Sequence, residues 1–297
     1  MQEKRRKTGA LLLVGLLAVS LFRGVAVCTV EGQPAVELPI LMYHHLLKEK
    51  SRQGKYTVSP DDFAADLDWL LREGYETVTV GQLIDWVNGD GSLPPKPVMI
   101  TFDDGYESFH EYAFPILKEF GFKSVFSEYA FPILKERNCK AVFSIIGRYA
   151  DEYTESEDHH INYSHCNWMQ IDELAGSGLV EIQNHSYDLH TNEAGKNGSM
   201  KVSGEAVSDY EARLHEDIGK MQTLCEDWCG LTPTAFTYPF GSISAEALPV
   251  LKVMGFQAAL TCLEKINYLT GDPEELFHLN RFNRPAGKSA QQILSAQ

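Results

Sequence analysis

Short, mainly apolar runs alternate along this chain with stretches in which apolar residues recur at helical spacing. Residues 39–43 and 98–102 are two such runs, and 179–182 forms a third. Runs of this kind, bounded by polar turns, are typical of strands that are buried on both faces. The alternation predicts an α/β fold with a layered or barrel-shaped sheet, and we expect late strands at 234–237 and 277–279.

Two of the intervening stretches read as helices. Ser59 precedes a proline and two acidic residues, the arrangement expected at a helix start, and apolar residues then recur up to Leu71. Residues 204–228 carry a second apolar stripe of helical period.

The first 33 residues have a different character. Four basic residues, Lys4 to Lys7, precede fifteen uncharged residues from Thr8 to Phe22 that are rich in Leu, Val and Ala. This layout is typical of an export signal, and it is shorter than the roughly 18–20 residues that cross a bilayer comfortably. We predict that residues 1–33 are a signal peptide or membrane anchor plus linker, and that 34–297 form one domain. The protein is then exported, and either released or held at the membrane.

Composition excludes one class of partner. The chain has 41 acidic against 26 basic side chains, a formal net charge of −15. Nucleic acids are bound through a surplus of Lys and Arg, so we predict no nucleic-acid partner. The hydrophobic fraction of 44% is ample for a packed core.

A tandem repeat interrupts the pattern. Residues 111–127 and 128–144 are identical at thirteen of seventeen positions, and each copy reads as a short helix followed by a strand. The first copy runs directly into the second and leaves no loop, although parallel connections need room. We expect one copy to occupy the fold and the other to be an accommodated insertion.

Two adjacent carboxylates follow the second buried run. Asp103 and Asp104 stand in the sequence Thr-Phe-Asp-Asp-Gly, directly after residues 98–102. Asp-Asp-Gly on its own is most often a turn. At the end of an interior strand, however, the pair is well placed to divide two roles, one carboxylate binding a metal and one taking a proton.

A pair of histidines follows the third run. His185 and His190 are five residues apart, which suits a loop that folds back better than one face of a helix. Two imidazoles and one carboxylate are a common metal-ligand set that leaves positions open for water and substrate. Together with Asp103 and Asp104, the pair indicates a metal-dependent hydrolase.

Other histidines give weaker signals. His44 and His45 end the first strand and are candidates for a barrel mouth, whereas His159, His160 and His165 lie in a polar stretch that we expect to be a solvated loop. The sequence contains no HExxH helix, GxSxG elbow or GxxxxGK[ST] phosphate loop.

These motifs resemble, in their order, those of the polysaccharide deacetylase family, also called the NodB homology domain or carbohydrate esterase family 4. Residues 101–105 resemble its first motif, 184–190 its second and 237–241 its third, and the resemblance runs from about Leu38 to Ser289. The spacing of the histidines is most similar to the branch that deacetylates poly-N-acetylglucosamine. The resemblance implies a distorted (β/α)7 barrel with a metal at the C-terminal ends of the strands.

The resemblance also implies roles for single residues. Asp104, His185 and His190 would hold a divalent ion, usually Zn²⁺ with Co²⁺ as an alternative, and Asp103 would be the general base. The backbone N–H of Phe240 would lie near the oxyanion, and Tyr238 and Phe240, on either side of Pro239, would shape the sugar groove.

The chain departs from the family pattern at two of these positions. Phe236 stands where many members have an arginine that orients the base, and Arg281 is the candidate replacement. The late motif that supplies the general acid is missing, and His44 is the first candidate for that role, with His278 behind it.

The predicted function is therefore removal of N-acetyl groups from an extracellular or cell-wall polysaccharide. Two alternatives stay open at this stage. One is a catalytically impaired glycan-binding relic of the same fold, disturbed by the repeat, and the other is a deacylase of a non-sugar amide.

Overall fold

The structure, a computed structural model, describes residues 35–123, 139–156, 158–193 and 195–297. The predicted signal segment and the join between the two repeat copies lie outside these residues. No helix in the described part of the chain is long and apolar enough to cross a membrane.

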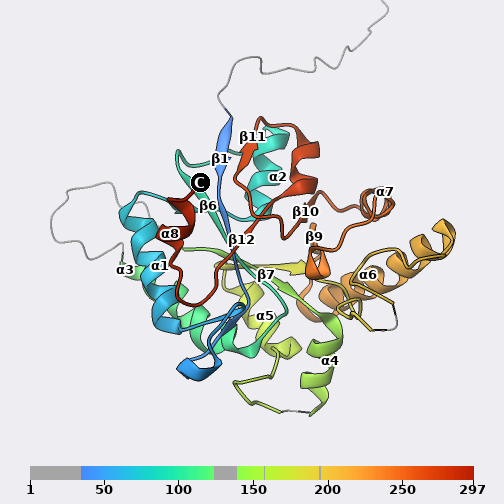
Figure 1. Cartoon of the computed structure of the whole chain (residues 1–297), viewed down its shortest axis with the longest axis horizontal. Helices are drawn as coiled ribbons and strands as arrows, with labels where there is room; N and C mark the ends of the chain where they lie inside the picture. The colour runs from blue at the N-terminus through green and yellow to red at the C-terminus, as the bar shows by residue number, and fades with distance from the viewer. Residues whose placement is uncertain (1–34, 124–138, 157, 194) are drawn as a thin grey trace, which may run out of the picture. The chain divides into compact units, whose positions relative to one another are not determined.

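A parallel sheet forms the centre of the domain (Figure 1). Among the described residues its strands run in the order β10 (Ala258–Leu260), β9 (Ala235–Thr237), β8 (Val180–Asn184), β7 (Ala141–Ile145), β6 (Pro97–Phe102), β2 (Ile40–Tyr43) and β12 (Phe282–Asn283). The short strand β5 (Glu76–Thr77) also pairs with β6. Leu279, just before β12, forms a parallel bridge with Leu260 of β10. This contact draws the two ends of the sheet together, so the fold is the distorted (β/α)7 barrel that was predicted.

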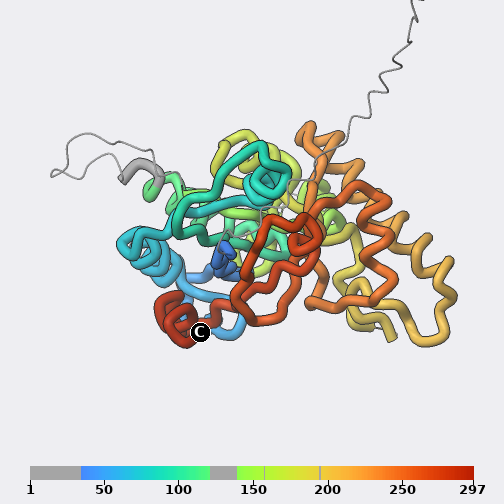
Figure 2. The backbone as a smooth tube through the Cα atoms, turned by 90° about the horizontal axis from the view of Figure 1, so that it is seen from above, coloured from blue at the N-terminus to red at the C-terminus, as the bar shows by residue number. Residues whose placement is uncertain are grey.

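Helices surround the sheet (Figure 1). They are α1 (Pro60–Arg72), α2 (Val80–Asn88), α3 (Phe114–Lys123), α4 (Gly147–Ser156), α5 (Trp168–Gly176), α6 (Val207–Cys229), α7 (Ala247–Val253) and α8 (Ala290–Leu294). The predicted start of α1 is confirmed, because the Ser59 side chain accepts a hydrogen bond from the Asp62 N–H. At the other end of the chain, α8 lies beside α1 in both Figure 1 and Figure 2.

One predicted strand is wrong. Residues 277–279 were expected to be extended, but residues up to His278 belong to the 3-10 helix η4 (Pro273–His278). Asp272 caps this helix by accepting a hydrogen bond from the Glu274 N–H, and Pro273 fits its first position. Only Leu279 continues into the bridge with β10.

The two repeat copies contribute different elements. Helix α3 comes from the first copy, and β7 begins within the second copy at Ala141. Residues 124–138 lie outside the described part. The helix–strand unit is therefore assembled from the first half of one copy and the second half of the other.

Side-chain alternation along the strands decides what reaches the barrel mouth. On β2 and β6, Leu41 and Ile100 pack in the cluster that contacts the surrounding helices, whereas Ile40 and Met99 belong to a second cluster with residues of β7, β9 and β10. Continuing the same alternation past the strand ends gives His44 and Asp103 the inner side. The interior at this level is polar: Ser144 and Thr237 share a 2.7 Å hydrogen bond.

Candidate active site

A cavity of about 460 Å³ opens at the C-terminal ends of β2, β6 and β8. Its lining includes the predicted residues His44, Asp103, Asp104, His185, His190 and Phe240. It also includes residues that the sequence did not single out, among them Tyr56, Tyr106, Cys262 and Glu264. Cavities of this size and position are usual for ligand sites in barrel folds.

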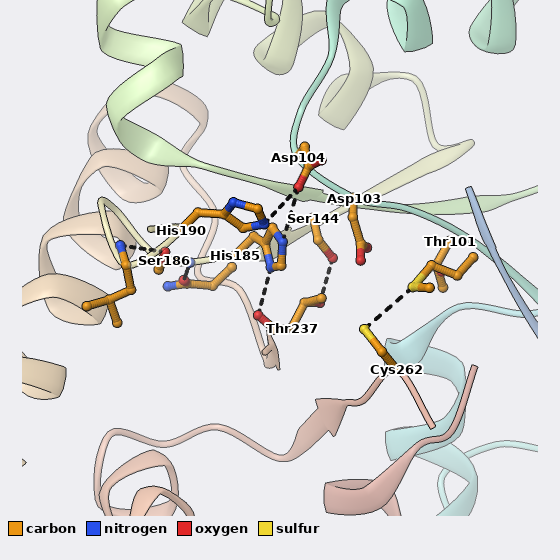
Figure 3. A network of polar contacts seen from close by, with 12 residues as sticks. Thr101, Asp103, Asp104, Ser144, His185, Ser186, His190, Thr237 and Cys262 are labelled. Carbon is orange, nitrogen blue, oxygen red and sulfur yellow. Dashed lines mark hydrogen bonds and ion pairs between the residues drawn. The ribbon is translucent and has the colours of Figure 1, made fainter. Parts of the chain in front are cut away.

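Three of the lining residues face one another (Figure 3). The Asp104 Oδ1 atom lies 3.4 Å from the Nε2 atom of His185 and 3.3 Å from the Nε2 atom of His190. Ligand atoms of the three residues all lie within 4.8 Å of one another. The same Oδ1 atom is buried and has no hydrogen-bond partner of normal geometry among the described residues. A buried carboxylate oxygen facing two imidazole nitrogens fits a divalent cation, so this donor set suits a metal such as zinc.

The local backbone turns these ligands inward. Asp104 has a φ of 72°, in the left-handed region, and Gly105 follows with a φ of 84°. A non-glycine residue in this region is uncommon and costs conformational free energy, and such residues cluster at functional turns. In the histidine loop, Ser186 has a φ of 73°, and its N–H donates to the Asn184 side chain. As predicted from the spacing, His185 and His190 lie on a loop that folds back.

A carboxylate on α6 fixes the backbone of the loop that carries His185 and His190. Asp217 of α6 accepts hydrogen bonds from the N–H groups of Tyr187 and Asp188, at 2.8 and 2.9 Å. His185 is oriented in turn by a 2.8 Å contact between its Nδ1 atom and the Thr237 carbonyl. Because Nδ1 then carries the hydrogen, the Nε2 lone pair is left for a metal.

Electrostatics favour the charge states that metal ligands need at Asp104 and His190. Burial lowers the pKa of His185, but its contact with Asp104 raises that pKa above its ordinary value. Burial raises the pKa of Asp104, but the contact with His185 and the charges of the nearby histidines hold it well below its ordinary value. Burial, together with His185, lowers the pKa of His190 to about 4. At neutral pH the carboxylate is therefore ionised and the His190 ring is neutral.

Asp103 points away from Asp104 (Figure 3). Its carboxylate instead meets the buried side chain of Arg281. Two nitrogens of Arg281 bind its two oxygens at 2.7 and 2.8 Å, and the Arg281 Nε–H donates to the Thr261 carbonyl. Burial raises the pKa of Asp103, but Arg281 keeps it below its ordinary value. The structure thus brings together the predicted base and the predicted replacement arginine, whereas Phe236 is buried in the core.

The two candidates for the general acid are separated by the fold. His44 lines the cavity, its ring centroid lies 4.7 Å from that of Tyr56, and burial lowers its pKa. His278 is exposed at the end of η4 and is not part of the cavity lining.

The third motif forms the 3-10 turn η3 (Pro239–Gly241). Phe240 has a φ of 58°, and its half-exposed ring lies 4.1 Å from the His190 ring. Tyr238 does not shape the groove as expected. It follows Phe236 by two residues, so it shares the outward face of β9 and is buried in the cluster beneath α6 and α7. Pro239 is also buried.

The expectation of a solvated loop is wrong for His165. Its side chain is buried between Tyr106 and Tyr149, with ring centroids at 4.6 and 4.2 Å. His159 and His160 are exposed, as expected, although His159 bonds to the buried Glu107. The surrounding residues Tyr106, Tyr149 and Tyr153 belong to no recognised motif. The polar composition of the stretch around His165 therefore predicted a solvated loop.

Comparison with known proteins identifies the family. The model for the polysaccharide deacetylase family matches residues 90–127 and 124–259, more than half of the chain. This chain belongs to the polysaccharide deacetylase family. The match confirms the predicted family, whose members are deacetylating hydrolases.

Individual relatives agree with this assignment. The chain is 27% identical to the poly-β-1,6-N-acetyl-D-glucosamine N-deacetylase of Escherichia coli K12, over 86% of this chain and 38% of that protein. A protein of the same name from Staphylococcus epidermidis is 23% identical, over 76% of this chain and 68% of that one. The chain thus spans well under half the length of the Escherichia coli relative.

Solved structures share the fold. IcaB from Ammonifex degensii is 26% identical, with a TM-score of 0.66, and the match covers 89% of this chain and 96% of that one. A de-N-acetylase from Aggregatibacter actinomycetemcomitans has a TM-score of 0.70 at 24% identity, covering 88% and 100% of the two chains.

Proposed function

We propose that this deacetylase-family chain is a metal-dependent hydrolase that removes N-acetyl groups from an exported polysaccharide built of N-acetylglucosamine. One observation carries the proposal: Asp103, held by Arg281, is next in sequence to Asp104, whose free carboxylate oxygen faces His185 and His190 in one open cavity. A proton acceptor and a metal-ligand set at adjacent positions suit hydrolysis of an amide.

The substrate class rests on the relatives. Those from Escherichia coli and Staphylococcus epidermidis are named as deacetylases of poly-β-1,6-N-acetyl-D-glucosamine. The histidine spacing of five supports the same branch. An extracellular or cell-envelope location rests on the basic and apolar N-terminal stretch, with the signal either cleaved or kept as an anchor.

Asp104, His185 and His190 would hold the metal, with Zn²⁺ favoured by the nitrogen and oxygen donors and Co²⁺ as an alternative. A divalent cation bound there supplies positive charge that polarises an acetamide carbonyl and raises the acidity of a nearby water.

The side chains perform the proton transfers. Asp103 is ionised at neutral pH and takes a proton from the water as it attacks the carbonyl carbon. Arg281 keeps the Asp103 carboxylate in one orientation through both oxygens. The hydrogen bonds of η3 occupy the N–H groups of Gly241 and Ser242, which leaves the N–H of Phe240 as the candidate donor to the oxyanion. His44, which lines the same cavity, is the candidate to protonate the leaving amine. Because burial lowers its pKa and leaves the ring neutral at pH 7, it would first take up the proton that Asp103 removes from the water.

Acetate release tests the proposal. The substrates are β-1,6-linked and β-1,4-linked N-acetylglucosamine oligomers and peptidoglycan, with and without added zinc or cobalt. We expect release that chelation and Asp104→Ala abolish. Stoichiometric zinc binding without release from any glycan would instead indicate a glycan-binding relic, and release only from simple acylated amines a non-sugar deacylase.

A further inference from the structure

Four aromatic rings form one stack beside the cavity. Its members are His45, Tyr106, His165 and Tyr149, and we call them the ring stack. Successive centroids are 4.3, 4.6 and 4.2 Å apart, and the planes of neighbours differ by 7°, 24° and 21°. Tyr106 is the member that lies between two imidazoles, so both of its faces are covered.

Hydrogen bonds hold the ring stack in place. The two ring nitrogens of His45 contact the Ser108 hydroxyl at 2.6 Å and the Asn162 carbonyl at 3.2 Å. Tyr106 and His165 form an antiparallel bridge through their backbones. The outer member His45 is therefore held by side-chain hydrogen bonds, and the inner members Tyr106 and His165 are held through their backbones.

The segment that carries His165 is also tied to the metal-site turn. The Cys166 N–H donates to the Gly105 carbonyl at 2.8 Å, and the Glu107 N–H donates to the Ser164 carbonyl at 2.9 Å. These bonds lie on either side of Tyr106. Its position is thus fixed relative to Asp104, two residues before it in the sequence.

This arrangement restricts what Tyr106 can offer to a ligand. Because its faces are occupied, the ring cannot serve as a platform on which a sugar stacks. Tyr106 nevertheless lines the cavity. With both faces covered, the ring edge, which carries the hydroxyl, is the part left to contact a ligand. A tyrosine hydroxyl is a hydrogen-bond donor at neutral pH, since the ordinary pKa of a phenol is about 10.

The neighbouring imidazoles add no charge to the site. Burial lowers the pKa of His45, and it lowers that of His165 to about 4. Neutral rings on both faces keep Tyr106 in place without repelling a cation held by Asp104. A structural role alone would not require a phenol at the centre of the ring stack, since a phenylalanine ring would pack in the same way.

We propose that Tyr106 is a substrate-contacting residue whose hydroxyl donates a hydrogen bond to an oxygen of the N-acetyl sugar bound in the cavity, and that His45 and His165 are positioning residues that act through it. The inference rests on the proposed function and names a specificity contact within the same site. An N-acetyl sugar carries several acceptor oxygens, and one fixed donor favours those orientations that place one of these oxygens against it.

The test compares Tyr106→Phe with the unaltered full chain, using a β-1,6-linked N-acetylglucosamine pentamer as substrate and zinc added to saturation. We expect kcat/KM to fall about 5- to 20-fold, as for loss of one hydrogen bond to substrate, while zinc affinity and melting temperature stay the same. Tyr268→Phe is the matched control, because Tyr268 is exposed on β11 (Asn267–Leu269) and does not line the cavity.

Variants of His165 test the positioning role. His165→Ala removes one wall of the ring stack, so we expect kcat/KM to fall, whereas His165→Phe keeps a flat ring there and should retain most of it. In the Tyr106→Phe background, His165→Ala should cost little more, because the hydroxyl that it positions is already gone. If His165→Ala does not fold, Tyr106→Phe still tests the hydroxyl contact. His165→Phe then tests whether a flat ring at position 165 is enough to keep kcat/KM.

Turnover of Tyr106→Phe within twofold of the unaltered chain overturns the inference. The inference is also overturned if His165→Ala lowers kcat/KM in the Tyr106→Phe background by as much as it does alone. Failure of the proposed function is recognised separately, because the unaltered zinc-loaded chain would then release no acetate from the pentamer.

Discussion

Arg281 holds Asp103 through both carboxylate oxygens, at 2.7 and 2.8 Å, although the two residues are 178 positions apart. Both side chains are buried, so the pair is shielded from salt and from competing water. The contact couples the end of β6 to the segment just before β12, and it sets the orientation of the proposed base from outside the metal site.

Replacing Arg281 by Lys should therefore impair the base and spare the metal. An ammonium cannot bind both oxygens in a plane, so we expect kcat to fall about 10- to 100-fold, as for other groups that orient a reacting residue, with zinc affinity unchanged. Arg284→Lys is the matched control, since Arg284 is equally buried but pairs with Asp66, away from the cavity lining. That variant should lose stability and keep its kcat. Equal effects on kcat would contradict the assigned role of Arg281.

Substitutions of the adjacent carboxylates Asp103 and Asp104 should cause two different defects. Asp103→Asn should retain zinc and lose about 10²- to 10⁴-fold in kcat, the usual contribution of a general base. Asp104→Asn should lose zinc affinity itself, because a charged ligand is replaced by a neutral one. Zinc content after dialysis, measured by atomic absorption, distinguishes them. Asp188→Asn, an exposed carboxylate of the histidine loop paired with Arg148, is the control. If Asp103→Asn also loses zinc, the division of roles is wrong.

The sequence predicted the fold and much of the site because both depend on short-range pattern. Buried runs ending in polar residues gave the strands, and carboxyl ends of parallel strands meet at one edge, so Asp103, Asp104, His185 and His190 were expected together. Strand alternation could also have been applied to Tyr238, which shares its face with Phe236. Side-chain direction, and not motif membership, decides whether a residue reaches the cavity.

What the sequence missed depends on contacts between distant segments. His165 is buried because Tyr106, which follows β6, and Tyr149 and Tyr153 of α4 converge on it from two places in the chain. No local periodicity reports such a cluster. The strand predicted at 277–279 is wrong for a related reason. The apolar residues of η4 pack against β10 and α2, as those of a strand would, so their burial does not distinguish the two structures.

Burial of His165 has a consequence for stability. Its pKa is lowered to about 4 in the folded chain, so between that value and the unfolded value of about 6.5 the unfolded chain binds more protons. Stability from this residue is complete above pH 6.5 and is lost as the pH falls towards 4, by up to about 3 kcal/mol. His165→Phe cannot titrate, so the difference in unfolding free energy between the two proteins should change over this range. Denaturant melts at pH 7.5, 6, 5 and 4 measure it, and a constant difference would contradict burial of a neutral ring.

The tandem repeat allows a deletion that keeps every described element. Removal of residues 124–140 joins the first copy's helix to the second copy's strand and restores a single helix–strand unit. We expect α3 to end earlier, at Phe120, because Gly121 suits the residue after a helix and Phe122 and Lys123 then serve as the short link to β7. The shortened chain should be soluble, bind zinc and release acetate at a rate close to that of the full chain.

A deletion of equal length within α6, residues 207–223, is the control. It removes Tyr210, Leu214 and Ile218 from the core, so it should yield insoluble protein. Circular dichroism and zinc content of the two shortened chains provide the comparison. If the chain lacking residues 124–140 is as insoluble as the control, residues of the second unit are needed for folding, and the repeat is not an insertion that the barrel accommodates.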